Sequence, residues 1–255
     1  LLLNGWIYPT DASINVALSQ AAGPGPAAPS LAVPDAAGRW VTVIPDLGFP
    51  AGKSKTVIAN LSGKFPARDY RVRIRTGMQV YWDQASVVTG GTRQVSRVTT
   101  LQPAAADLHY RGFSRTYRKG GRYGPHWFDY DEVSTEPRWQ LIDGLFTRFG
   151  DVRSLLLGSD DQYVTMAPGD EMSVEFDATG LPALSPGWRR DFLLYSDGWI
   201  KDADLNTAHG TTVEPLPYHA MSRYPYGPAE GYPSDAAAQR YREEYHTRRL
   251  RRAPG

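Results

Sequence analysis

The sequence predicts a mainly β protein: an antiparallel β-sandwich of the jelly-roll type with a long irregular insertion and a C-terminal α-helix. Three observations predict this class. Apolar and polar residues alternate in many short segments, which is the period of half-buried strands. The 255 residues include 25 Gly and 20 Pro, the residues that form turns between short strands. A clear helical pattern occurs at one place, near the C-terminus.

The segment 70–84 shows the strand pattern most clearly. Its first half places apolar residues on one face and arginines on the other: Tyr70, Val72 and Ile74 against Arg71, Arg73 and Arg75. After Gly77 the alternation resumes as far as Trp82. The segment therefore predicts two adjacent strands, or one strand with a bulge at Gly77, at the centre of the sandwich.

The same kind of pattern predicts the other elements of the chain. Strands are expected at 1–8, 14–20, 40–44, 56–61, 85–89, 95–101, 107–112, 152–157, 163–166, 172–176 and 191–195. Residues 21–38 are rich in Pro, Gly and Ala, which predicts a surface loop or a linker. Ser234 or Asp235 caps the expected helix, which runs to Arg249.

Between residues 113 and 149 the alternation fails, which predicts a long aromatic-rich excursion with a short helical turn near 140–146. Loops carried by a rigid scaffold often supply binding contacts. Four aromatic residues are candidate ligand contacts, because exposed rings can stack on a sugar: Tyr117, Tyr123, Trp127 and Tyr130. The alternative is that these rings pack the excursion onto the sandwich. We expect one domain over 1–233, and a helix with a basic tail over 234–255.

The composition excludes several classes of protein. The formal net charge is +1, so no global field attracts nucleic acid, which is not an expected partner. The absence of Cys excludes disulfides, thiolate metal sites and a Cys nucleophile, and it fits an exported bacterial protein. No apolar run reaches the roughly 18–20 residues that span a bilayer. The chain begins at Leu1 without a signal-peptide pattern, so we expect a processed chain or the C-terminal part of a longer one.

Arginines form two candidate partner-binding groups. The outward row of the segment 70–84 and the C-terminal tail contribute Arg71, Arg73, Arg75, Arg248, Arg249, Arg251 and Arg252. Such a row is usually a solvated face that prevents sheets from associating edge to edge. It could instead meet an acidic partner, and the tail could lie on an anionic membrane surface.

One segment has the alternate oxygen side chains of a Ca²⁺-binding loop: Asp202, Asp204 and Asn206. It lacks the Gly expected three positions further on, and no Glu closes a twelve-residue loop. We therefore favour a solvated turn, in which Asp and Asn bind their own backbone, over a Ca²⁺ site. No other cofactor is expected.

Catalytic patterns are absent from the sequence. The five His are scattered without a metal-ligand spacing, and there is no Gly-x-Ser-x-Gly motif or phosphate-binding loop. Paired carboxylates drawn from Glu136, Asp143 and Asp191 could in principle face one cleft. Nothing in the sequence nominates them, so a binding module is preferred to an enzyme.

Several stretches resemble the C-terminal region of large exported bacterial proteins that contain FG-GAP (integrin-type propeller) repeats and ASPIC/UnbV segments. They are 3–11 (LNGWIYPTD), 72–83 (VRIRTGMQVYWD), 194–206 (LYSDGWIKDADLN), 213–221 (VEPLPYHAM), 224–228 (YPYGP) and 245–249 (YHTRR). The Asp-x-Asp-x-Asp-Gly loops of the propeller blades are not present, so their metal sites do not carry over. The resemblance implies a location outside the cytoplasm and a non-catalytic role in adhesion or assembly.

Three functions follow as hypotheses. The first is an extracytoplasmic interaction or assembly module of a bacterium, such as an accessory subunit docked on a larger membrane complex, which binds other protein subunits through 113–130 and the basic tail. The second is a carbohydrate-binding module that uses the aromatic platform. The third, ranked last, is a hydrolase with carboxylate catalysis.

Overall fold

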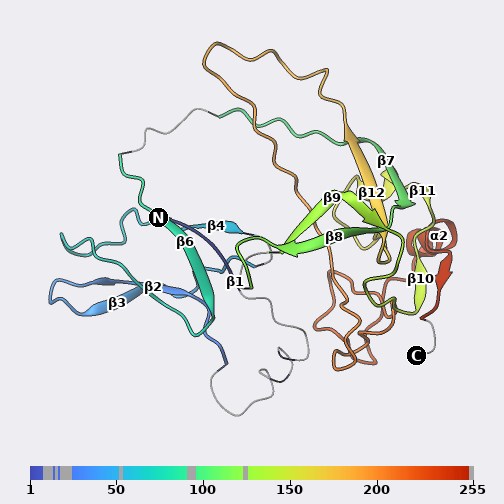
Figure 1. Cartoon of the computed structure of the whole chain (residues 1–255), viewed down its shortest axis with the longest axis horizontal. Helices are drawn as coiled ribbons and strands as arrows, with labels where there is room; N and C mark the ends of the chain where they lie inside the picture. Colours follow the sequence, from blue (N-terminus) through green and yellow to red (C-terminus); the bar gives the residue numbers. More distant parts are fainter. Residues whose placement is uncertain are drawn as a thin grey trace. The chain divides into compact units, whose positions relative to one another are not determined.

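The computed structural model describes residues 1–7, 14, 17, 25–51, 54–90, 96–122 and 126–252 (Figure 1). The chain divides into two compact units. Unit 1 comprises Leu1–Val95 and Thr116–Asp129, and unit 2 comprises Ser96–Arg115 and Tyr130–Gly255. The expectation of a mainly β chain with antiparallel sheets and a helix near the C-terminus is confirmed. The helix belongs to unit 2, while the expected domain boundary at residue 233 stays a prediction.

The first sheet of unit 1 has the order β4-β1-β6, and both neighbours run antiparallel to β1. Its strands are β1 (Leu2–Ile7), β4 (Lys55–Ile58) and β6 (Val80–Ser86). The register of β1 on β6 shifts between Asn4 and Gly5. At this point a Cβ on Gly5 would stand 2.2 Å from the carbonyl oxygen of Tyr81, so a glycine is required there.

The second sheet of unit 1 has the order β3-β2-β5. Its strands are β2 (Ser30–Pro34), β3 (Trp40–Ile44) and β5 (Arg73–Arg75). The expected alternation is present, since Arg73 and Arg75 are exposed and Ile74 is half-buried. The expected position at the centre is wrong, because β5 lies at the edge of its sheet. Moreover, β5 and β6 belong to different sheets.

Side chains from both sheets of unit 1 meet in one hydrophobic core. Leu3 of β1 packs in the same cluster as Leu31 and Val33 of β2, and all three are buried. Burial of a side chain of this size contributes about 1.5–3 kcal/mol relative to exposure. This cluster therefore stabilises the two sheets together, while the jelly-roll sandwich arrangement stays a prediction.

Unit 2 contains a three-stranded antiparallel sheet of order β11-β7-β12. Its strands are β7 (Pro103–Tyr110), β11 (Gly150–Asp151) and β12 (Asp170–Phe176). A second pair joins β10 (Gly144–Phe146) to β13 (Arg248–Leu250). The helix α2 (Ala236–Glu244) starts at Asp235, whose carboxylate accepts hydrogen bonds from two backbone amides of the first turn.

The core of unit 2 lies between the β7 sheet, α2 and the β10–β13 pair. Its most buried members include Leu108, Phe146, Val152, Val213 and Tyr241. Tyr241 lies on α2, and its hydroxyl donates to the carbonyl oxygen of residue 163 at 2.8 Å. The helix is thus fixed by burial of one face and by one partly buried hydrogen bond.

The segment 113–149 is not irregular as expected. It forms the paired strands β8 (Phe113–Arg118) and β9 (His126–Ser134), and β10 replaces the helical turn expected near 140–146. Four of the expected strands are wrong. The segment 152–157 contains a 3₁₀ helix (Arg153–Leu156) instead of a strand. The structure describes residues 96–101, 163–166 and 191–195 and forms no strand in any of these segments. Conversely, β2 lies within the segment 21–38 that was expected to be a loop.

Candidate interaction surfaces

The arginine row of unit 1 lies beside an aromatic ring. The guanidinium of Arg73 stands over the Trp40 ring at 4.0 Å from its centroid, and that of Arg71 lies 5.7 Å from the same centroid. Arg71 also donates to both carboxylate oxygens of Asp69, at 2.6–3.1 Å. These hydrogen bonds lower the pKa of Asp69 below its usual value. Two exposed cations therefore lie beside the same half-buried aromatic ring, and one of them has a carboxylate partner.

The aromatic residues proposed as a sugar platform do not share one face of β9. Trp127 and Tyr130 are three positions apart in this strand. Side chains of a strand alternate between its two faces, so these two rings point to opposite sides. Tyr117 is exposed on β8, and Tyr123 lies outside the described residues. The geometry thus separates the predicted platform into individual rings.

Tyr130 is held in a network of charged residues in unit 2. Its ring lies under the guanidinium of Arg111 at 3.8 Å, and its hydroxyl donates to the carboxylate of Glu171 at 3.0 Å. The hydrogen bond to Glu171 raises the pKa of the Tyr130 hydroxyl. Arg111 in turn pairs with Glu171 at 3.1 Å. One face of this ring is therefore occupied by the protein itself.

The C-terminal arginines differ in their surroundings. Arg248 is largely buried and pairs with the carboxylate of Asp170, while its Nε donates to the carbonyl oxygen of Thr147 at 3.0 Å. It belongs to the internal framework of unit 2 and is not presented to a partner. Arg249, Arg251 and Arg252 are exposed. The expected basic surface of the tail is therefore reduced to these three residues.

The segment expected either to bind Ca²⁺ or to form a turn has the hydrogen bonds of a turn. The backbone amide of Asp204 donates to the carboxylate of Asp202 at 3.2 Å, and that of Asn206 donates to the carboxylate of Asp204 at 2.8 Å. These are the short-range bonds by which Asx residues stabilise turns. In the described part of the chain, no group of three or more His, Asp or Glu is arranged to hold a metal ion.

A cluster that the sequence did not predict surrounds His219. The Nδ1 atom of its ring lies 2.8 Å from the carboxylate of Asp161, and the Nε2 atom lies 3.1 Å from the carboxylate of Asp197. Ser159 donates its hydroxyl hydrogen to Asp197 as well. The hydrogen bond to Asp161, followed by that to Asp197, raises the pKa of His219. With both ring nitrogens paired to carboxylates, His219 is not placed to accept a proton from Ser159.

Lys201 fixes the Glu-Pro-Leu-Pro stretch that was noted in the sequence. Its ammonium donates to three carbonyl oxygens, of residues 212, 213 and 215, at 2.9, 2.7 and 3.2 Å. It also lies 5.1 Å from the centroid of the Tyr224 ring. Burial lowers the pKa of Lys201 to about 8. All three ammonium hydrogens are used within the protein, which indicates a structural role.

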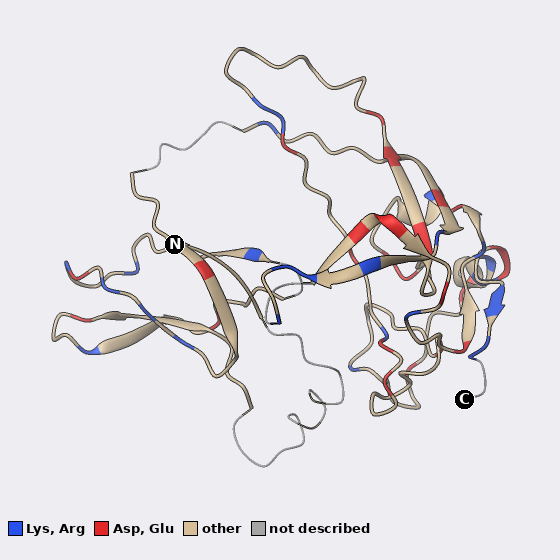
Figure 2. Cartoon of the chain, in the orientation of Figure 1, with Lys and Arg blue, Asp and Glu red and all other residues tan. Residues whose placement is uncertain are grey.

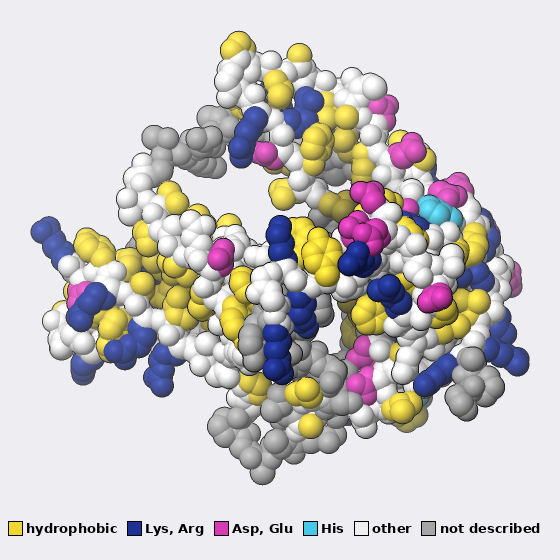
Figure 3. All heavy atoms as spheres, in the orientation of Figure 1, with side chains coloured by type: hydrophobic (Ala, Val, Ile, Leu, Met, Phe, Trp, Pro, Cys, Tyr) yellow, Lys and Arg dark blue, Asp and Glu magenta, His cyan; other side chains and the backbone are white. Residues whose placement is uncertain are grey.

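Among the described residues, four consecutive large apolar side chains are strongly exposed in the irregular chain beyond β12. Phe192, Leu193, Leu194 and Tyr195 expose 72%, 100%, 77% and 83% of their surface. In Figure 1 the chain between β12 and residue 200 runs as a long loop, and Figure 3 shows hydrophobic side chains at its surface. We call residues 192–195 the apolar segment. Two residues connect the C-terminal side of this segment to the rest of unit 2. The carboxylate of Asp197 binds the His219 ring, and the ring of Trp199 packs against that of Tyr224, with 5.4 Å between the ring centroids.

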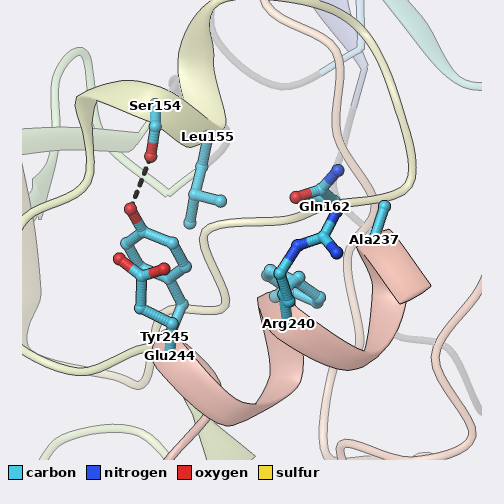
Figure 4. Close-up of a pocket in the computed structure, with 8 residues that line it drawn as sticks. Ser154, Leu155, Gln162, Ala237, Arg240, Glu244 and Tyr245 are labelled. Carbon is cyan, nitrogen blue, oxygen red and sulfur yellow. Dashed lines mark hydrogen bonds between the residues drawn. The ribbon is translucent and has the colours of Figure 1, made fainter.

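A shallow recess lies between α2 and the 3₁₀ helix of unit 2 (Figure 4). It is lined by Ser154, Leu155, Gln162, Ala237, Arg240, Tyr241, Glu244 and Tyr245. The hydroxyls of Ser154 and Tyr245 bind each other at 2.6 Å. The lining contains no histidine, and its one carboxylate, of Glu244, is exposed. Within the described residues, the Ser154 hydroxyl is therefore bonded to Tyr245 and not to this carboxylate.

Of the three carboxylates considered for hydrolysis, those of Asp143 and Asp191 have separate local partners. Asp143 accepts a hydrogen bond from the backbone amide of Arg252 at 2.5 Å, and Asp191 pairs with Arg189 at 3.2 Å. The backbone amide of Glu136 donates to the hydroxyl of Ser134 at 3.1 Å.

Within the described residues, no helix has the length and apolar composition that crossing a membrane requires.

Comparison with known proteins gives no match: no family model, no curated protein and no solved structure is significantly similar to the chain. The resemblance to FG-GAP and ASPIC/UnbV proteins therefore stays a prediction.

Proposed function

We propose that the chain is a non-catalytic interaction module that binds a partner protein through the apolar segment 192–195. The observation that carries this proposal is the exposure of four consecutive large apolar side chains on a chain segment anchored at its C-terminal side. Contiguous exposed apolar surface is typical of protein interaction sites. The location outside a bacterial cytoplasm and the docking on a membrane complex are part of this proposal, and they rest on the resemblance.

The energetics favour a partner for this segment. Burial of each large apolar side chain contributes about 1.5–3 kcal/mol, whereas its immobilisation costs about 0.5–1.5 kcal/mol. The difference is about 0–2.5 kcal/mol for each side chain, so the four together contribute up to about 10 kcal/mol toward the cost of association. Because these four side chains are 72–100% exposed, a partner can bind them without displacing buried contacts of unit 2.

Site-specific crosslinking tests this proposal. A photoreactive amino acid replaces Leu193 in the native host, and in a control chain it replaces Val98, which is 87% exposed in the same unit. A discrete adduct with one partner at position 193 but not at 98 is expected. The double variant Phe192→Ser, Leu194→Ser should prevent co-purification of that partner, while Val98→Ser should retain it. Equal adducts at both positions, or none at 193, would contradict the proposal.

The second candidate, carbohydrate binding, is favoured by the exposure of Trp127. Nearly half of this side chain is exposed, and Lys119 lies 4.7 Å from its ring centroid, an arrangement that combines a stacking surface with a polar donor. A glycan array tests it: specific sugar binding that is lost in Trp127→Ala and retained in Tyr130→Phe would support this function. Absence of any specific sugar contradicts it.

A further inference from the structure

The charges of the chain are divided unequally between its two units. Unit 1 contains twelve Lys and Arg against six Asp and Glu, and unit 2 contains sixteen against twenty-one. Unit 1 therefore has a formal net charge of +6 and unit 2 one of −5, and together they give the +1 of the whole chain. Figure 2 shows Lys and Arg distributed along the strands and loops of unit 1. A basic unit attracts anionic partners even when the whole chain is nearly neutral.

Three of the twelve cations of unit 1 lie on β5 or two residues before it. Arg71, Arg73 and Arg75 point to the same outer face, and all three are exposed. Arg71 is paired with Asp69, but in the described part of the chain no carboxylate lies within ion-pair distance of Arg73 or Arg75. Stacking on Trp40 restricts the Arg73 guanidinium, and a stacked guanidinium still offers N–H donors at its edge to a carboxylate.

The position of β5 in its sheet adds a second element to this surface. Within the described residues, β2 is the one strand paired with β5, so β5 forms an edge of the sheet. An edge strand has backbone groups that can pair with an added strand. Residues two apart in a strand are spaced by about 6.6–6.8 Å. Alternate carboxylates of an added strand therefore match the spacing of alternate arginines.

From these observations we propose that the edge strand β5 binds an extended acidic segment of a partner protein. The segment adds as a further strand, and Asp or Glu side chains at alternate positions pair with Arg73 and Arg75. Such opposite-charge pairs between neighbouring strands are stabilising. This surface belongs to unit 1 and shares no residue with the apolar segment 192–195, so the proposal does not depend on the proposed function.

Fluorescence polarisation with three labelled peptides of equal charge tests this proposal. The probe TEVEVEVET has glutamates at alternate positions. The peptide TEEVVEEVT has the same composition but no two glutamates at alternate positions, and TEPEVEPET carries prolines that hinder strand pairing. We expect the alternating probe to bind at least tenfold more tightly than either of the others. Binding should weaken between low and high salt, because exposed charge pairs are screened. Equal binding of the three peptides would show that only net charge is sensed and would overturn the proposal.

Charge reversal locates the site. The double variant Arg73→Glu, Arg75→Glu should lower affinity for the alternating probe at least tenfold. The control Lys55→Glu changes an exposed cation on β4, in the other sheet of unit 1, and should change affinity less than threefold. If charge reversal unfolds the chain, the milder pair Arg73→Gln, Arg75→Gln replaces it. Equal losses in the control and the double variant would overturn the proposal, as would a β5 variant that is folded and binds normally.

Discussion

His219 lies between two carboxylates that are distant in sequence, with Asp161 at its Nδ1 atom and Asp197 at its Nε2 atom. A neutral imidazole can donate from only one of its nitrogens, so the protonated ring satisfies both carboxylates. The cluster thereby joins the loop around 161 to the chain that follows the apolar segment 192–195. This link makes the anchoring of that segment dependent on pH.

The pH dependence of stability should reveal this link. The pKa of His219 is raised above its ordinary value of 6.5, so its contribution is fully present below pH 6.5 and is lost as pH rises through the higher folded pKa. In urea unfolding, the difference in stability between the wild type and His219→Gln should therefore shrink as pH increases from about 6 to about 9. A difference that grows over this range would contradict the assignment.

His246 should show the opposite dependence. It is 3% exposed, its Nε2 atom has no hydrogen-bond partner within the described residues, and burial lowers its pKa. Its stabilising neutral form is fully present above the ordinary pKa of 6.5 and is lost as pH falls through the lower folded pKa. His246→Phe can retain the stacking on Tyr241. This variant should lose less stability than the wild type between about pH 7 and about pH 5, as measured by urea unfolding.

Two adjacent arginines of β13 should differ sharply in their effect on stability. Arg248 pairs with Asp170, whose side chain is 1% exposed, whereas Arg249 is exposed. Arg248→Met leaves the Asp170 carboxylate buried without its cation and should cost about 3 kcal/mol. Arg249→Met removes a solvated charge and should cost less than about 0.5 kcal/mol. Equal costs in denaturant unfolding would show that the internal ion pair does not stabilise unit 2.

The removal of Lys201 should loosen the Glu-Pro-Leu-Pro stretch. Lys201→Met deletes three hydrogen bonds and leaves their carbonyl acceptors, at least partly buried, without donors. We expect a loss of roughly 2–4 kcal/mol in the free energy of unfolding. Lys55→Met, at an exposed position on β4, is the matched control and should have little effect. Hydrogen exchange of amides near residue 213 would show whether the loss is local.

Local pattern predicted the strands whose polar and apolar residues alternate. Strand β3 was predicted with its observed bounds, and the outward row of arginines on β5 was predicted from the same alternation. Strand β2 was missed because its sequence, SLAVP, is short and lies among Pro, Gly and Ala, while its burial depends on core partners distant in sequence. The pattern of a strand describes its faces and does not identify its partners.

The same limitation explains the errors at the candidate sites. The segment 191–195 has the composition of a strand, yet no strand pairs with it in the described chain, so its apolar residues remain exposed. The cluster of His219 was not predictable because its carboxylates are 58 and 22 residues away. Lys201 lies in the stretch 194–206, which was noted only for its resemblance to a family. Its three carbonyl acceptors become its neighbours only through the path of the folded loop.

The apolar segment itself provides the last prediction, which separates stability from binding. Leu193 and Leu194 are 100% and 77% exposed, so their replacement by serine removes almost no buried surface. The double variant Leu193→Ser, Leu194→Ser should therefore change the free energy of unfolding by less than about 0.5 kcal/mol. It should also lower the binding of a hydrophobic dye to the folded chain, because the exposed apolar area decreases. The matched control is Leu108→Ser, in the buried core of unit 2, which should destabilise by more than about 2 kcal/mol. Strong destabilisation by the surface pair would mean that the segment packs within its own chain, and the proposed partner site would then be lost.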